Sequence, residues 1–205
     1  MSTTKTSHMN YNKALQLANG LKGTLVELGF GKGNSLREFI SYMNNGNIDK
    51  RNIWIYESFT GYNDPKPEDK GAFVKGGHKR PPQPAYDIRH TIDKDVHLVK
   101  GYIEDTLPEQ YGDEKVAIIH SHLISYSSTK HGLEVFDKGL QTNGIIVVTD
   151  YEIFPGTKQA VDEFILSKKG EYKLIEQNTN FACIKKVNFK DLLKNPPKRT
   201  RSILI

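Results

Sequence analysis

The 205 residues suffice for one domain with its own hydrophobic core, and 37% hydrophobic with 26% charged residues is ordinary for a soluble globular protein. No apolar run approaches the roughly 20 residues of a membrane-spanning helix, and the first ten residues lack the apolar core of a signal peptide, so we expect no membrane partner. The single cysteine, Cys183, excludes an intramolecular disulfide and favours a cytoplasmic location. The net charge of +5 allows an acidic partner such as nucleic acid without requiring one.

Composition divides the chain into three segments. We expect a flexible N-terminus over residues 1–9, one domain over residues 10–188 and a basic tail over residues 189–205. The densest basic cluster runs from Lys194 to Arg201, and it is either a solvated terminus or a segment that binds phosphate or a partner. At the start of the domain, residues 10–19 predict a short helix that ends at Gly20.

A strand, a glycine-rich turn and a helix are predicted next. Residues 25–28 are a short apolar run, typical of a strand, and glycines follow at positions 29, 31 and 33. Apolar residues at helical spacing begin at Leu36, and Ser35 with Glu38 fits a capping box. The glycines remove the Cβ atoms that would hold a ligand off the backbone, and the helix start offers free N–H groups.

The acidic residue before the turn narrows the choice of ligand. A dinucleotide site requires a glycine where Asn34 stands, so that pattern fails. A carboxylate at Glu27 suits a cation such as the amino group of a methionine moiety. Unless the turn holds no ligand at all, the predicted contacts are Glu27, Gly29, Phe30, Gly31, Gly33 and Ser35.

The second predicted strand, residues 52–56, ends at another acid, Glu57. Its two oxygens can accept hydrogen bonds from both hydroxyls of a ribose, with Ser58 beside it; the alternative is a solvated charge at a strand end. Residues 59–84 are the least regular part of the chain, made basic by Lys75, His78, Lys79 and Arg80. A loop of this length is either a lid that selects an anionic or hydroxylated substrate or a solvated mobile segment.

A short helix over residues 85–92 and a third strand over residues 96–100 follow. At the end of that strand, Tyr102 or Ile103 suits the face of a purine ring, and Asp105 suits its amino hydrogens. Residues 116–120 predict a fourth strand, and their continuous apolar character implies burial on both faces.

The remaining elements complete an α/β domain. They are a helix over residues 127–140, a turn at Asn143 and Gly144, a strand over 145–150, a helix over 155–169 and a hairpin over 172–186. The predicted fold is a doubly wound, Rossmann-like, mostly parallel seven-stranded sheet with a C-terminal antiparallel hairpin. Ligands bind such sheets at the carboxyl ends of the strands, which is where the sequence places Glu27, Glu57, Asp105, His122 and Asp150.

These motifs, in this order, resemble the class I S-adenosylmethionine-dependent methyltransferases, and most closely the macrocin O-methyltransferase family of sugar O-methyltransferases. The similar segments are residues 26–29, 55–61, 98–108, 126–129 and 143–151, with Gly156, Ala160, Val161 and Phe164 in the helix that follows. The resemblance implies S-adenosyl-L-methionine as cofactor, a small-molecule acceptor and O-methylation of a hydroxyl. A homodimer is common in that family.

The sequence departs from the family where the chemistry lies. Where the family usually has two aspartates at the end of strand four, this chain has His122 and Ile124; where it has Asp-Asp-Tyr after strand five, this chain has Thr149, Asp150 and Tyr151. In members with a divalent ion, the first strand-four aspartate and the strand-five pair hold it, and the second strand-four aspartate is the base. Mg²⁺ prefers several oxygen ligands, and an imidazole, a hydroxyl and one carboxylate make a poor site. We therefore assign no metal ligands and expect a mechanism without the metal.

Three uses of the site remain open. A histidine near its ordinary pKa of about 6.5 suits general-base catalysis, so His122, His120 and Asp150 are the candidate catalytic residues, with His122 also among the cofactor contacts. Alternatively, the acceptor is an amine or a carboxylate that needs little base, because positioning supplies much of the rate. In the third case the cofactor is used otherwise or not at all, and His122 is only a hydrogen-bonded residue at a strand end.

Two other functions compete with small-molecule methylation. A nucleic-acid methyltransferase is suggested by the basic tail and loop, but no target-base motif of the Asn-Pro-Pro-Tyr kind follows strand four. The other is a non-catalytic domain that binds S-adenosylmethionine and acts through partners.

Overall fold

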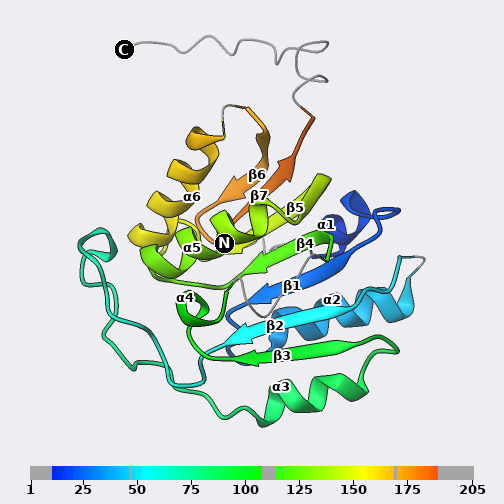
Figure 1. Cartoon of the computed structure of the whole chain (residues 1–205), viewed down its shortest axis with the longest axis horizontal. Helices are drawn as coiled ribbons and strands as arrows, with labels where there is room; N and C mark the ends of the chain where they lie inside the picture. Colours follow the sequence, from blue (N-terminus) through cyan, green and yellow to red (C-terminus); the bar gives the residue numbers. More distant parts are fainter. Residues whose placement is uncertain (1–10, 47, 108–113, 169, 189–205) are drawn as a thin grey trace, which may run out of the picture.

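A computed structural model describes residues 11–46, 48–107, 114–168 and 170–188. These residues form a seven-stranded sheet in the order β3-β2-β1-β4-β5-β7-β6 (Figure 1). The first five strands pair in parallel, and β7 runs antiparallel to both β5 and β6, so the predicted sheet and its terminal hairpin are confirmed. The predicted flexible N-terminus and basic tail lie outside the described residues. The strands are β1 (Thr24–Leu28), β2 (Ile53–Glu57), β3 (Val96–Lys100), β4 (Val116–Ser121), β5 (Leu140–Thr149), β6 (Tyr172–Asn178) and β7 (Phe181–Lys186).

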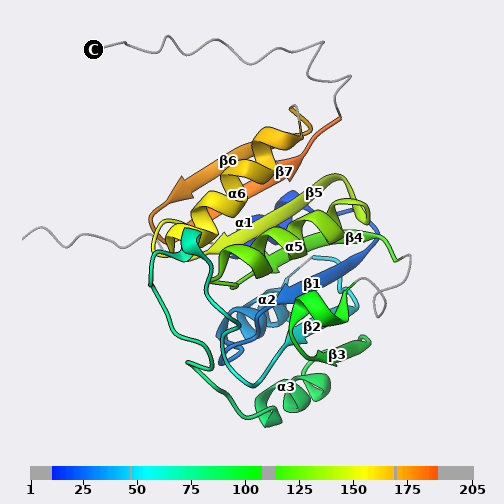
Figure 2. The same cartoon turned by 60° about the vertical axis from the view of Figure 1, so that its left-hand side comes forward.

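Helices cover both faces of the sheet because successive strand residues point to opposite sides. Leu25 packs in one cluster with α1, α2, α3 and η2, and Val26 packs in the other with α4, α5 and α6. Figure 2 shows α4, α5 and α6 on the face opposite α2. The helices are α1 (Tyr11–Leu17), α2 (Asn34–Asn45), η1 (Pro67–Asp69), α3 (Gln83–Asp87), η2 (Ile88–His90), α4 (Ile103–Thr106), α5 (Tyr126–Asp137) and α6 (Pro155–Ser167). In the described part of the chain, none is long and apolar enough to cross a membrane.

The strand order places a crevice between β1 and β4. These strands are neighbours, yet the chain leaves β1 for α2 on one face and leaves β4 for α5 on the other. Such a change of direction opens space at the carboxyl ends of the two strands. The predicted site therefore has room where the glycine turn follows β1.

Two local predictions were wrong. Asn143 and Gly144 do not turn the chain between elements; they lie inside β5, where its register with β4 shifts and Asn143 has φ 69°. An Asn-Gly pair suits an irregularity inside a strand as well as a turn, because both conformations use positive φ.

The predicted capping box at the start of α2 is also absent. Gly33 precedes the helix with φ 75° and no side chain caps it. Ser35 instead shares a 3.1 Å hydrogen bond with the hydroxyl of Tyr11 on α1, so its oxygen ties two helices together.

Candidate active site

A cavity of about 370 Å³ lies at the carboxyl ends of the central strands. It collects most of the residues that the sequence singled out. Of these, the lining contains Gly29, Phe30, Gly31, Gly33, Ser35, Glu57, Ser58, Tyr102, Ile103, His122 and Asp150. Glu27, Asp105 and His120 are not part of the lining.

The glycine turn forms one wall of the cavity. Gly29, Gly31 and Gly33 have φ values of 82°, 54° and 75°, which residues with a Cβ rarely adopt. A Cβ on Gly33 would lie 2.2 Å from the Phe30 ring, whereas one on Gly31 would meet only the His122 ring, at 3.7 Å. The backbone at Gly31 is therefore bare toward the cavity, which suits close approach of a ligand.

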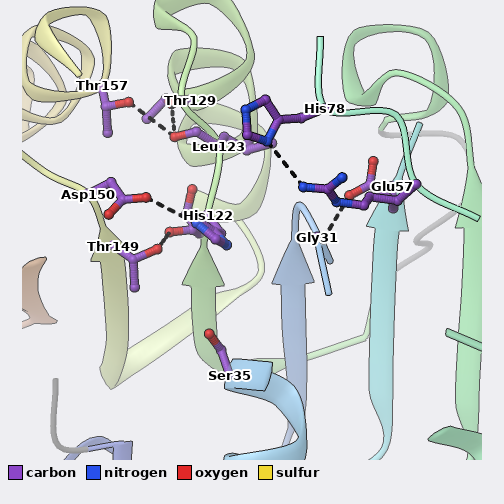
Figure 3. Close-up of polar contacts among 12 residues, drawn as sticks. Gly31, Ser35, Glu57, His78, His122, Leu123, Thr129, Thr149, Asp150 and Thr157 are labelled. Carbon is purple, nitrogen blue, oxygen red and sulfur yellow. Dashed lines mark hydrogen bonds and ion pairs between the residues drawn. The ribbon is translucent and has the colours of Figure 1, made fainter. Parts of the chain in front are cut away.

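Glu57 is held at the end of β2 by backbone donors. The Gly31 N–H donates to its Oε2 at 3.1 Å (Figure 3). The Phe59 N–H donates to its Oε1 at 3.1 Å. Phe59 reaches this position with φ 58°. Ser58 Oγ lies 3.3 Å from the same Oε1 and 2.9 Å from the Gly61 carbonyl oxygen. Each carboxylate oxygen has two acceptor sites, so Oε2 keeps one site for a ribose hydroxyl, and a second hydroxyl at Oε1 would replace the Ser58 contact. This arrangement fits a ribose whose adjoining chain lies along the glycine turn.

The end of β3 supplies a flat apolar face but not the expected acid. Tyr102 and Ile103 line the cavity, as predicted from their position. Asp105 is exposed on α4 and points away, because the helix starts at Ile103 and rotates it outward. Its neighbour Glu104 faces inward, where its Oε1 accepts from Asn63 Nδ2 at 2.7 Å. Asp105 is therefore not positioned to accept a hydrogen bond from the amino group of a purine bound at the end of β3.

Glu27 and His120 are buried together beneath the turn. His120 Nδ1 lies 2.7 Å from Glu27 Oε2, and the two side chains are 0% and 1% exposed. The His120 ring packs edge-on against Tyr11 and Phe39. Neither residue has access to the cavity, so the structure does not place His120 where a base would act. Glu27 is 1% exposed and outside the cavity lining, so we assign it no direct contact with a ligand amino group.

His122 and Asp150 both line the cavity, and their side chains contact each other. His122 Nε2 and Asp150 Oδ2 are 3.1 Å apart, and the side chains are 40% and 30% exposed (Figure 3). The hydrogen bond that His122 donates to Asp150 raises the pKa of His122, and burial opposes that shift only in part. With Nε2 bonded to Asp150, the free ring nitrogen is Nδ1, which is the atom nearest the open side of Gly31.

The donor set does not fit a Mg²⁺ site. The Thr149 hydroxyl donates to the Ser121 carbonyl at 3.3 Å, and Asp150 is bound to His122. Ile124 lines the cavity with a hydrocarbon side chain at the position of the second family aspartate. Within the described ranges, no group of three His, Cys, Asp or Glu residues could hold a metal ion.

Several cavity residues were not predicted individually. They come from the long loop, from the end of β4 through the first turn of α5, and from the segment before α6, and they include Tyr62, Asn63, Leu123, Ser125, Ser128 and Phe154. Ser125 could have been identified from the sequence as the N-cap of a helix, because serine is common at that position. In the structure its hydroxyl accepts from the Ser128 N–H at 3.3 Å and caps α5. The loop residues reach the cavity through contacts distant in sequence, which no local pattern shows.

The sheet has the strand order β3-β2-β1-β4-β5-β7-β6, and the glycine turn after β1 faces the acidic residue at the end of β2. These features define a Rossmann-like methyltransferase fold. The profile of the macrocin O-methyltransferase (TylF) family matches residues 5–180, and the chain belongs to that family. The chain is 26% identical over 161 residues to demethyldecarbamoylnovobiocin O-methyltransferase of Streptomyces niveus. That alignment covers 72% of this chain and spans 60% of the length of the relative.

Solved structures share the fold. The O-methyltransferase NovP aligns with a TM-score of 0.73 at 22% identity, over 87% of this chain and 78% of that protein. The calicheamicin methyltransferase CalS11 aligns with a TM-score of 0.73 at 17% identity, over 85% of this chain and 76% of that protein. At such identities the similarity concerns the fold, so the chemistry must be argued from the cavity.

Proposed function

We propose that this protein is an S-adenosylmethionine-dependent methyltransferase that methylates a hydroxyl of a small molecule in the cytoplasm. The observation that carries the proposal is the His122–Asp150 pair in the same cavity as the glycine turn and Glu57. When bound, the cofactor supplies a methyl group on a positively charged sulfur, whose carbon is open to attack by an oxygen nucleophile.

The residues of this chain fit the cofactor in three places. Glu57 would accept hydrogen bonds from the ribose hydroxyls, and the bare backbone at Gly31 leaves room beside it. Tyr102 and Ile103 would pack against the base. Glu27 would act from below, by fixing the turn through its contact with His120 rather than by touching the ligand.

His122 is the proposed general base. Asp150 accepts from Nε2–H, which leaves the lone pair of Nδ1 directed toward the glycine turn. Nδ1 would take the proton of the acceptor hydroxyl, and the cofactor would supply the methyl group by loss of its carbon–sulfur bond, which leaves the neutral thioether S-adenosylhomocysteine. The Asp150 carboxylate then stabilises the imidazolium that forms, and the proton leaves to solvent after turnover. No step in this scheme requires a metal-bound oxygen.

Binding and turnover test the proposal separately. Calorimetry with S-adenosylmethionine and S-adenosylhomocysteine should show saturable uptake, and a panel of hydroxylated acceptors should yield S-adenosylhomocysteine. His122→Ala should lower turnover by about 10²–10⁴-fold, the usual contribution of a general base, with a smaller change in cofactor affinity. His90→Ala, an exposed histidine outside the cavity, is the matched control.

Each negative outcome has a distinct meaning. No uptake of either compound would refute the whole proposal. Uptake without turnover on any acceptor would favour a non-catalytic binding domain. Steeply salt-dependent affinity for duplex nucleic acid, with methylation of it, would replace the small-molecule acceptor by a nucleic acid.

A further inference from the structure

The long loop between β2 and α3 closes on itself beside the cavity. The Gly76 N–H donates to the Tyr62 carbonyl at 2.8 Å, and the Tyr62 N–H donates to the Gly77 carbonyl at 3.0 Å. A Cβ on Gly61 would lie 2.4 Å from the Gly77 oxygen, so only glycine lets the two limbs meet. The loop therefore has a defined shape at its base.

The far end of the loop is anchored as well. Asp69 is 1% exposed, and its Oδ1 accepts from the Tyr126 N–H at the start of α5 at 2.7 Å. Its Oδ2 accepts from the Lys66 N–H at 2.7 Å, which fixes the carboxylate within its own turn. A loop held at both ends presents its side chains to the cavity in a fixed arrangement.

This arrangement orients Arg80. His78 adopts φ 57°, an unfavourable conformation for a residue with a Cβ, and its ring packs on Tyr62 with centroids 5.1 Å apart. Arg80 Nη2 donates to His78 Nδ1 at 3.2 Å, and Arg80 Nη1 donates to the Lys79 carbonyl at 3.3 Å. His78 and Arg80 both line the cavity that holds His122 and Asp150. Figure 3 shows His78 on the same side of the strand ends as His122 and Glu57.

Among the described residues, no carboxylate forms an ion pair with Arg80. Both hydrogen-bond partners of Arg80 are neutral acceptors. The nearby Lys75, by contrast, is paired with Asp64 at 2.7 Å. A half-buried guanidinium with free donors is a ready partner for a carboxylate or a phosphate, because its planar fork matches both groups.

We propose that Arg80, oriented by His78, binds an oxyanion on the methyl acceptor, so the substrate is an acidic hydroxyl compound carrying a carboxylate or a phosphate ester. This inference rests on the proposed function. The competing occupant is the carboxylate at the methionine end of the cofactor, which carries the same chemistry. The experiment must therefore separate the acceptor from the cofactor.

Inorganic phosphate is the probe, titrated by calorimetry into the protein saturated with S-adenosylhomocysteine. Saturable phosphate binding should be seen, and Arg80→Met should weaken it by about tenfold or more, the loss expected for a charged hydrogen-bonded contact. Lys79→Met is the matched control, because it removes a neighbouring exposed charge that does not line the cavity. S-Adenosylhomocysteine affinity should be the same in all three proteins.

Three results would overturn the inference. Weaker S-adenosylhomocysteine binding in Arg80→Met, with phosphate competing against it, would assign Arg80 to the cofactor. Equal loss of phosphate binding in Arg80→Met and Lys79→Met would indicate only general charge attraction. If the wild-type protein shows no saturable phosphate binding, Arg80 does not form an anion site. If S-adenosylhomocysteine itself fails to bind, the proposed function falls instead.

Matched pairs of acceptors test whether the methyl acceptor carries the oxyanion and whether that oxyanion is a phosphate or a carboxylate. Methyl transfer is measured with sugars against their phosphates and with hydroxybenzoates against their methyl esters. A phosphorylated or carboxylated acceptor should be preferred by the wild-type protein, and Arg80→Met should raise KM for that acceptor more than it lowers kcat. Equal use of the neutral partner in every pair would contradict an anionic substrate.

Discussion

Glu27 Oε2 and His120 Nδ1 lie 2.7 Å apart, closed off from solvent beneath the glycine turn. The contact joins β1 to β4 at the point where the sheet opens. It is therefore part of the support for the turn, since any movement of Glu27 would be transmitted to Gly29 two residues later.

His120→Ala should consequently destabilise the protein. Removing one member of a buried pair leaves its partner uncompensated, which costs about 3–5 kcal/mol in the free energy of unfolding. Urea denaturation measures the loss, and Glu27→Gln with the double variant completes a cycle that isolates the pairwise energy. Unchanged stability combined with lost turnover would instead mean that His120 takes part in the chemistry.

Glu57→Gln tests the ribose contact. The substitution keeps the shape of the side chain but removes the negative charge that both backbone donors and the ribose hydroxyls would share. Charge-assisted hydrogen bonds contribute about 1.5–3 kcal/mol, so S-adenosylhomocysteine affinity should fall by about tenfold to a hundredfold. Calorimetry reports the change, with Glu176→Gln on β6 as a control outside the cavity. Equal affinities in the two variants would refute the assignment.

The pH dependence of turnover tests the His122–Asp150 pair. A general base acts when it is unprotonated, so the rate should rise with pH through the pKa of His122. Asp150 raises that pKa, and Asp150→Asn should therefore move the rise to lower pH. The plateau should also fall, because the imidazolium loses its charged partner and the ring loses its orientation.

Profiles of kcat/KM for wild type, Asp150→Asn and the remote control Asp93→Asn provide the measurement. A profile of Asp150→Asn that rises at the same pH as wild type would show that another group is the base. Unchanged plateaus in all three proteins would limit Asp150 to a structural role.

The sequence predicted the sheet well because its central strands are buried on both faces. Runs such as residues 116–119 and 145–148 are continuously apolar, and their burial in the structure leaves little choice of element. Glu57 and His122 could be placed at the cavity for the same reason, since the carboxyl end of a buried parallel strand marks the edge where ligands bind; their roles stay predictions.

The rest depended on orientation and on distant contacts. Whether Glu104 or Asp105 faces inward follows from where α4 begins, and the helix is only four residues long. His120 and His122 are two residues apart, yet one ends in the core and the other in the cavity, because β4 ends at Ser121 between them. The sequence places Arg80 only within a basic loop. Its position at the cavity depends on the contact between Gly61 and Gly77 across that loop, which no local pattern predicts.

Chelation should leave turnover unchanged. The side chains at the family's metal positions are the imidazole of His122, the hydroxyl of Thr149 and one carboxylate, Asp150, which is bound to His122. Mg²⁺ favours an octahedron of oxygens and binds such a set poorly. Turnover is compared before and after dialysis against EDTA. A loss that added Mg²⁺ restores would replace the histidine base by metal-assisted chemistry.

Gly156→Ala tests whether the anchored loop serves the acceptor. A Cβ at this position would lie 1.9 Å from Asp69 Oδ1 and 2.9 Å from the Tyr126 nitrogen, so it would displace the hydrogen bond that fixes the loop to α5. Overpacking of this kind costs about 1–3 kcal/mol, which urea denaturation can detect.

The functional consequence should fall on one substrate only. The substitution at Gly156 contacts neither the glycine turn nor Glu57. The affinity for S-adenosylhomocysteine should therefore be unchanged, while KM for the acceptor rises. Asp69→Asn, which keeps an acceptor oxygen for the Tyr126 N–H, should have a smaller effect than Gly156→Ala. If both variants lose cofactor affinity and acceptor affinity together, the loop supports the whole cavity and not the acceptor side alone.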